Sequence, residues 1–487
     1  MMAENDINNE EQYKIAADKL MNYISNTDFK FSNKEEIDKK YNDFRNDYSP
    51  EKLKEIPDDK LLEGLFSLNP KNKSLCYSLE YGYKLFGGLI NGYIFKYPLF
   101  TRDGKWFEGN PKEIKELTLE QAINKAKSIR DSLIKVYKYI KESNFENLDD
   151  YRNFEIEIGN ELIKFVKPIW VRKYFHMIFP SIFNDFHKDE LQSHILYGLG
   201  VVPGNTYYER CGQLVEINRI IDCLPHDFSR ACLEKFGDIK TFYRLGSSDN
   251  DGNKYADEWR KKGIIAIGWP KLGDLKQFAN SKNKISEELI KSRLLDNGES
   301  PISAPRKAKE IKTFYESDKD AIFAVADGEK IIGLADNIGE NEFDENNHMA
   351  HYKKGIWVKV FQDIIKLPNK NGWYLTSCVK ITDKENLLFL YNLYYWDERK
   401  IPIKTVEAYN KTKNPLNQIL YGPPGTGKTY NTVIKAMEII KGNSYDKIKE
   451  EYKTEYDEEK HGDFDSYCYK RIKAEFDKCN FQHYRQE

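Results

Sequence analysis

One eight-residue segment carries the clearest chemistry in this chain. It reads Gly-Pro-Pro-Gly-Thr-Gly-Lys-Thr and matches the pattern G-x-x-x-x-G-K-[ST] at every position. In this pattern, curled backbone N–H groups bind phosphate oxygens, the lysine reaches the β- and γ-phosphates, and the last hydroxyl ligates Mg²⁺. The predicted cofactor is therefore ATP or GTP with Mg²⁺. The loop contacts only phosphates, so it does not distinguish adenine from guanine. The nucleotide-binding residues are Gly422, Pro423, Pro424, Gly425, Thr426, Gly427, Lys428 and Thr429, and Thr429 is the metal ligand.

The elements around this loop fit the same chemistry. An apolar strand over 418–421 enters the loop, and a helix leaves it. This helix has Val433, Met437 and Ile440 on one face and ends at Gly442. Its N-terminus is predicted to face the bound anion, because the free N–H groups of a first helical turn attract negative charge.

Hydrolysis needs more than the loop. Phosphoryl transfer by this architecture requires an acidic residue on a second strand and a group that positions water. No apolar strand ending in Asp-Glu follows Gly442, and the acidic residues of 455–459 belong to a charged, solvated run. We therefore expect that this chain does not hydrolyse nucleotide unaided.

The stretch NQILYGPPGTGKTYNT (417–432) strongly resembles the start of the AAA+ module of McrB-type restriction subunits. The resemblance implies a nucleotide-driven motor that forms a ring and serves a McrC-like nuclease partner in modification-dependent, antiviral restriction. The acidic strand, sensor residues and arginine finger of that family have no counterpart here. The resemblance therefore implies that the sequence stops just inside the AAA+ module.

A second region, 236–400, combines several short strand-like segments with one or two helices. An Asp-Gly turn signal at Asp327-Gly328 divides one of them. This pattern favours a small β-barrel over a βαβ array. The segments FYRLGSS, ADEWRKKGIIAIGWPKLGDL, DAIFAVADGEKIIGLADNIG and HYKKGIWVKVF look like an EVE-type domain, a PUA-like barrel related to the YTH readers of methylated adenine. The resemblance implies binding of DNA at a modified base that is extruded from its helix and stacked in an aromatic cage.

Within this region, Trp269 is the first candidate for a cage wall. It ends the strand GIIAIGW, and Pro270 then forces the chain out of regular pairing. Trp259 and Trp357 are second candidates, and the alternative for all three is packing in the core. Further candidates could contact base edges or phosphates, with capping and solvated faces as the alternatives: Ser247, Asp274, Lys353, Lys354 and Lys359.

Charge constrains how such a region could bind DNA. Lys and Arg number 76 and Asp and Glu 78, so the net charge is −2. Residues 236–400 hold 27 basic and 26 acidic residues. Bulk electrostatic binding is excluded, so recognition must depend on the base contact.

No apolar run approaches the roughly 18 residues of a membrane span, and the seven cysteines form no C-x-x-C pair. A cytoplasmic protein is expected.

The predicted fold class is multidomain α+β. Residues 1–235 form a mostly helical accessory region with a short strand-like middle, and 117–143 is an amphipathic helix capped by Thr118 and Gln121. Residues 236–400 form the base-recognition domain, and 401–487 the first β–loop–α unit of an AAA+ domain. Two other functions stay open. The chain could be a stand-alone nucleic-acid-binding protein with a vestigial loop, or the barrel could bind RNA.

Overall fold

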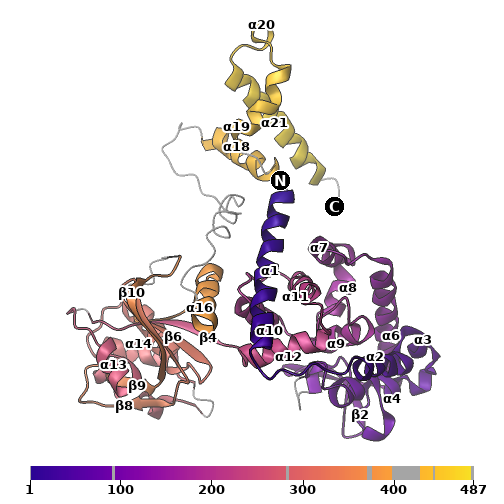
Figure 1. Ribbon diagram of the computed structural model, residues 1–487, viewed down its shortest axis with the longest axis horizontal. Coiled ribbons are helices and arrows are strands. Elements are labelled where there is room, and N and C mark those ends of the chain that lie inside the picture. The colour runs from indigo at the N-terminus through magenta and orange to yellow at the C-terminus, as the bar shows by residue number, and fades with distance from the viewer. Residues whose placement is uncertain are drawn as a thin grey trace. The chain divides into compact units, whose positions relative to one another are not determined.

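The computed structural model describes residues 2–89, 94–249, 251–280, 284–369, 376–397, 428–441 and 445–483. They form a mixed α/β structure that is mostly helical, with several small sheets (Figure 1). The chain divides into two compact units. One unit contains residues 9–401, and the other contains 1–8 together with 402–487.

The first part of the chain is helical. Its helices are α1 (Met2–Ser25), α2 (Lys34–Tyr48), α3 (Pro50–Glu55), α4 (Leu61–Phe66), α5 (Leu75–Tyr77), α6 (Leu119–Glu142), α7 (Leu148–Glu157), α8 (Gly159–Val166), α9 (Ile169–Ile178), α10 (Asp189–Gly198), α11 (Tyr207–Ile221) and α12 (Pro225–Phe236). The capping box predicted for α6 is present: the Thr118 side chain accepts from the Gln121 N–H, and the Gln121 side chain accepts from the Thr118 N–H. The helix buries Ala122, Ala126 and Leu133, as its spacing predicts.

The strand-like middle of this region is a small antiparallel sheet. It contains β1 (Phe100–Arg102), β2 (Lys105–Asn110) and β3 (Glu113–Leu117), in that order. The helices around it enclose two hydrophobic clusters. One cluster consists of side chains taken from between Ile37 and Val215 in the sequence. The other consists of side chains of α1, α10, α11 and α12 together with their neighbours.

The rest of this unit combines two sheets with helices. Its helices are α13 (Ala256–Lys262), α14 (Glu287–Asp296), α15 (Ala304–Tyr315) and α16 (Lys384–Trp396). Its strands are β4 (Thr241–Gly246), β5 (Ile264–Ile267), β6 (Ala321–Asp327), β7 (Lys330–Asp336), β8 (Asn341–Phe343), β9 (His351–Lys354), β10 (Ile356–Ile365) and β11 (Cys378–Lys380).

The larger sheet has the order β10-β7-β6-β4-β11, and the smaller one has the order β5-β9-β8. The predicted turn at Asp327-Gly328 does join β6 to β7 as an antiparallel hairpin. The central pair β4–β6 is parallel, with Thr241 opposite Ala321. A parallel pair needs a long crossover, and here the crossover carries α13, β5, α14 and α15. Together these elements bury one hydrophobic cluster, which includes Trp259, Ile265 and Phe323.

The sequence pattern predicts a small β-barrel for this region, and that prediction is wrong. Among the described residues, the strands form two open sheets, because the larger one ends at β10 and β11 and these two strands do not pair. The sheets are joined at Gly355. The chain leaves β9 in the small sheet, passes this single residue and enters β10 in the large one. The Gly355 N–H donates to the Gly263 carbonyl at 3.0 Å, so the corner is fixed by backbone bonding.

Helix α16 joins the sheets to the helical region. The Tyr391 ring of this helix packs against Phe242 of β4. The Tyr391 hydroxyl oxygen lies 2.8 Å from Nδ1 of His194, which belongs to α10. At the end of α16, the Trp396 indole N–H donates to the Gly198 carbonyl at 2.6 Å, and Lys359 of β10 pairs with Asp397 at 3.1 Å. The helix therefore contacts both halves of this unit.

The other unit contains α18 (Lys428–Lys441), α19 (Tyr445–Tyr452), α20 (Glu458–His461) and α21 (Phe464–His483). Val433 and Met437 of α18 are buried against Ile448 and Ile472, as the helical spacing predicts. The Ile440 side chain and Gly442 lie outside the described residues.

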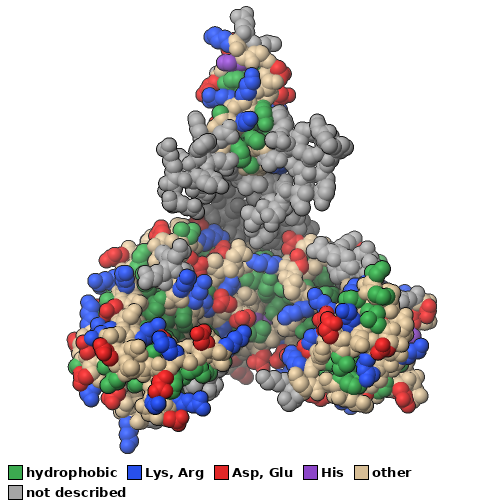
Figure 2. All heavy atoms as spheres, turned by 180° about the vertical axis from the view of Figure 1, so that it is seen from behind, with side chains coloured by type: hydrophobic (Ala, Val, Ile, Leu, Met, Phe, Trp, Pro, Cys, Tyr) green, Lys and Arg blue, Asp and Glu red, His purple; other side chains and the backbone are tan. Residues whose placement is uncertain are grey.

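The surface shows no field of a single sign in the view of Figure 2, where basic and acidic side chains are interspersed. This agrees with the near-zero net charge. Among the described residues, no helix is long and apolar enough to cross a membrane.

Candidate functional site

Trp269 follows the end of β5 in an unusual backbone conformation. Its φ and ψ are 66° and 54°, which is the left-handed region. That region is unfavourable for a bulky residue, and a following proline restricts the backbone further. Its side chain is half-buried against the cluster around Trp259 and Ile265. Strain of this kind persists only where the surroundings impose it, and it is concentrated at binding and catalytic sites.

Two neighbours hold this corner. His351, the first residue of β9, donates from Nε2 to the Trp269 carbonyl at 3.2 Å. Gly268 faces the segment before β9: a Cβ added there would lie 3.6 Å from the His348 carbonyl oxygen and 3.8 Å from Met349 Sδ. Burial lowers the pKa of His351, so the ring is neutral and keeps the hydrogen on Nε2 for this bond.

Tyr255 adds an aromatic face from a third segment. Its ring stacks on His348, with 6.2 Å between ring centroids, and on Trp259 at 6.3 Å. Its hydroxyl donates to Asp249 Oδ2 at 2.7 Å. This bond and those from Asn253 lower the pKa of Asp249 to about 2. The carboxylate is thus ionised at neutral pH and fixes the loop 247–255 that carries the Tyr255 ring.

Three segments therefore meet at this site: the loop 247–255, the corner 268–274 and the turn 344–351. They contribute aromatic faces, a fixed carboxylate and backbone carbonyls. The described chain contains no group of three His, Cys, Asp or Glu residues that could hold a metal ion. The arrangement is suited to holding a flat ring by stacking, with polar atoms at its edge.

The other two tryptophan candidates have structural positions. Trp259 is only 1% exposed and stacks beneath Tyr255, so it supports the site from within the core. Trp357 donates from its indole N–H to the Ile264 carbonyl at 3.1 Å and covers Gly333. It thereby links β10 of the large sheet to β5 of the small one.

The two polar candidates also make local bonds. The Ser247 hydroxyl is buried and donates to the Ala326 carbonyl at 3.0 Å. Asp274 accepts from the Lys276 N–H at 2.9 Å and caps the short turn that follows. Asp274 nevertheless lies near His351 at the corner. Burial lowers the pKa of His351, and the negative charge of Asp274 raises it by a smaller amount.

The three lysines differ from one another. Lys353 is buried and donates to the Tyr315 and Ser317 carbonyls at 3.2 and 2.6 Å, and burial lowers its pKa to about 8. Lys353, a predicted phosphate contact, is therefore placed in the core with two carbonyl partners. The Lys359 ammonium pairs with Asp397. The Lys354 side chain is 75% exposed and lies 3.6 Å from Glu342, which leaves it the most accessible of the three.

The phosphate-loop residues Gly422, Pro423, Pro424, Gly425, Thr426 and Gly427 lie outside the described residues. Lys428 and Thr429 begin α18, although their side chains are not described. Residues 428–441 are helical, which agrees with the helix predicted to follow the loop.

Tyr255, Asp249, His348 and His351 were not identified as candidates from the sequence. His348 and His351 lie three residues apart in a polar segment, and this spacing alone indicates no site. The acidic cluster around Asp249 just before Tyr255 was the available signal, but acidic loops are common at surfaces.

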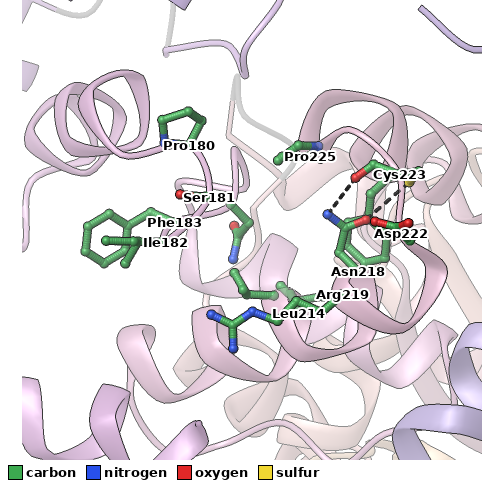
Figure 3. A pocket seen from close by; sticks show the side chains of 13 residues that line it. Pro180, Ser181, Ile182, Phe183, Leu214, Asn218, Arg219, Asp222, Cys223 and Pro225 are labelled. Atoms are coloured by element: carbon green, nitrogen blue, oxygen red, sulfur yellow. Dashed lines mark hydrogen bonds between the residues drawn. The ribbon is translucent and has the colours of Figure 1, made fainter. Parts of the chain in front are cut away.

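A separate cavity of about 350 Å³ lies in the helical region between the segment 180–184 and helix α11 (Figure 3). Several of its polar groups already have partners. Asn218 donates to the Cys223 carbonyl at 3.2 Å and accepts from the Cys223 thiol. Arg219 donates to the Phe145 carbonyl. Burial raises the pKa of Cys223 to about 12, so this thiol is not a thiolate at neutral pH.

Comparison with protein-family models, with curated proteins and with solved structures found no match for this chain.

Proposed function

We propose that residues 236–400 bind DNA at a modified base, which is extruded from its helix and stacked on Trp269. In this proposal the region is an EVE-like, PUA-related domain whose strands form open sheets. The observation that carries it is the half-buried Trp269, held in a left-handed conformation between Pro270 and the His351 bond, beside the Tyr255–His348 stack.

The energetics favour such a site. Stacking on an aromatic side chain contributes about 1–3 kcal/mol per base. Extruding a base from a duplex costs a few kcal/mol. Stacking alone thus roughly offsets extrusion, and a methyl group buried in the pocket adds about 0.8 kcal/mol. Discrimination against the unmodified base then rests on how closely the methyl group fits.

We also propose a wider role, as the recognition subunit of a McrB-like restriction system in the cytoplasm. Residues 422–429 would bind ATP or GTP with Mg²⁺, with the Lys428 ammonium on the phosphates and the Thr429 hydroxyl on the metal. The support is the match of these residues to the phosphate-loop pattern and the helical conformation of 428–441. A McrC-like nuclease would be the partner, and the motor would act as a ring.

The central test is Trp269→Ala against a matched tryptophan. Trp106 is also half-buried but lies on β2 of the helical region, so Trp106→Ala is the control. Fluorescence anisotropy measures binding to oligonucleotides with one N6-methyladenine, one 5-methylcytosine or no modification. We expect Trp269→Ala to weaken binding to the preferred modified strand by about 5- to 150-fold, the equivalent of one stacked base. We expect Trp106→Ala to bind like the parent.

Other outcomes would change the proposal. Equal binding by Trp269→Ala and the parent would reject the stacking assignment. Tighter binding to modified RNA than to modified DNA of the same sequence would replace DNA with RNA as the ligand. Circular dichroism of both variants checks that the fold is retained.

A further inference from the structure

The connection between α14 and α15 presents an isolated apolar side chain to solvent. Ile302 is 93% exposed, which makes it the most exposed of the large hydrophobic side chains that the structure describes. The chain reverses at Gly298, whose φ is 87°, and the Glu299 N–H then donates to the Leu294 carbonyl at 2.9 Å. The connection is therefore a tight turn with Ile302 near its tip.

The turn is braced on both sides of Ile302. Lys307 of α15 donates to Glu299 Oε2 at 2.6 Å, and the Ser303 hydroxyl donates to the same carboxylate. The Ser303 and Ser300 hydroxyls lie 2.7 Å apart, and the Ala304 N–H donates to the Ser300 carbonyl at 2.9 Å. The hydrogen bond from Lys307 lowers the pKa of Glu299, so the brace is ionic at neutral pH. An ordered turn thus holds the apolar tip in water.

This turn lies next to the Trp269 corner. Arg293 of α14 donates to the Leu272 carbonyl at 3.1 Å, and Asn297 donates to the Lys271 carbonyl at 3.4 Å. Lys271 is two residues after Trp269. Ile302 follows Asn297 by five residues, a span of at most about 17 Å. Helix α14 and the small sheet lie in the same body of the molecule (Figure 1).

The surroundings of Ile302 suit a polyanion. Lys271, Arg306 and Lys309 are exposed near the turn, and Arg306 lies 3.7 Å from Glu310. Of the acidic residues there, Glu299 is paired with Lys307 and Asp296 is exposed. Proteins that unstack duplex DNA insert apolar side chains such as Ile or Pro between base steps, with basic residues on the adjacent phosphates. Pro301 precedes Ile302 and is also exposed.

We propose that Ile302 is a wedge that enters duplex DNA and fills the space left by the base stacked on Trp269. The inference rests on the function proposed above and adds the form of the ligand, a duplex rather than a single strand. The wedge compensates for lost stacking inside the helix, whereas Trp269 holds the extruded base. Ile302 therefore acts only when a base has to be removed from a stack.

The test compares one modified strand in three forms. The strand carrying the preferred modified base is titrated alone, in a matched duplex, and in a duplex with an abasic site opposite that base. Ile302→Ala is compared with Ile356→Ala, which removes a 56% exposed side chain from β10. We expect Ile302→Ala to weaken binding of the matched duplex about tenfold and to leave the affinity for the single strand unchanged. In the duplex with the abasic site, the variant should bind nearly as tightly as the parent, because no stacking partner has to be replaced there. Ile356→Ala should match the parent in all three.

Each contrary result has its own meaning. Equal affinity of Ile302→Ala and the parent for the matched duplex overturns the wedge and leaves the Trp269 proposal intact. An equal loss on the single strand and the duplex overturns it too, because it shows a general contact. A parent protein that binds none of the three forms overturns the proposed function and the wedge together. Enhanced fluorescence of 2-aminopurine next to the modified base, reduced in Ile302→Ala, would support the wedge directly.

Discussion

At the residue scale, Trp269 combines backbone strain with an accessible ring, and two substitutions can separate these properties. Holding a residue other than glycine in the left-handed region costs about 1–2 kcal/mol. Trp269→Ala removes the ring and keeps this strain, whereas Trp269→Gly removes both. We expect the free energy of unfolding of Trp269→Gly to exceed that of Trp269→Ala by about 1 kcal/mol, as measured by urea denaturation. Both should lose the base contact equally. A glycine variant no more stable than the alanine variant would show that the corner is not strained.

Single residues also show where sequence reasoning reached its limit. Trp269 could be identified because a tryptophan at a strand end before a proline is a local signal. His351 could not be assigned to it, since the two residues are 82 positions apart and meet only through the β5–β9 pairing. The burial of Lys353 was not predictable for a similar reason. Its carbonyl partners at Tyr315 and Ser317 come from the end of α15 and the turn after it, and nothing local to Lys353 indicates them.

At the element scale, α16 depends on a buried histidine. His194 of α10 contacts Tyr391 through Nδ1, and its Nε2 donates to the Phe236 carbonyl at 3.3 Å. Burial lowers the pKa of His194 from 6.5 to about 4. The unfolded chain therefore takes up a proton below pH 6.5, while the folded chain does so only near pH 4. The contribution of His194 to the free energy of unfolding is therefore fully present above pH 6.5. It is lost as the pH falls to 4, and the whole loss is on the order of 3 kcal/mol.

Thermal unfolding from pH 7.5 to 4.5 measures this dependence. We expect Tm to fall across the window in the parent and to fall less steeply in His194→Gln, which has no proton to take up. His348→Gln is the control, because the His348 side chain is 60% exposed, and its slope should follow the parent. A His194→Gln slope equal to that of the parent would mean that other groups control the acid sensitivity. Burial also lowers the pKa of His176 and His187, so some slope should remain.

Elements with local signals were predictable from the sequence. The spacing and caps of α6 and the Asp327-Gly328 hairpin each lie within a short window. The parallel β4–β6 pair was not predictable, because its partners are separated by a crossover that contains four other elements. That pair fixes β4 and β6 at the centre of an open sheet, where a barrel had been expected.

At the scale of the whole molecule, the residues proposed to bind a base and those proposed to bind a nucleotide belong to different compact units, so the two proposed activities should be lost separately. We expect Lys428→Ala to weaken binding of fluorescent ATP and GTP analogues with Mg²⁺ by at least about tenfold, since the P-loop lysine contacts the β- and γ-phosphates. Binding of the modified oligonucleotide should not change. Lys435→Ala, on the same helix α18, is the control for both titrations. Phosphate release should stay at background for every variant, and release that only Lys428→Ala abolishes would show unaided hydrolysis.

The corner at Gly355 has a mechanical consequence. Because β9 and β10 are separated by one residue, the segment 351–365 is nearly continuous extended chain. Its first residue, His351, holds the Trp269 carbonyl, and Lys359 further along holds the end of α16 through Asp397. Eight residues at about 3.4 Å each span about 27 Å. The Trp269 corner and α16 are thus connected through one short stretch of chain, so a shift of His351 is expected to reach α16 along residues 351–359.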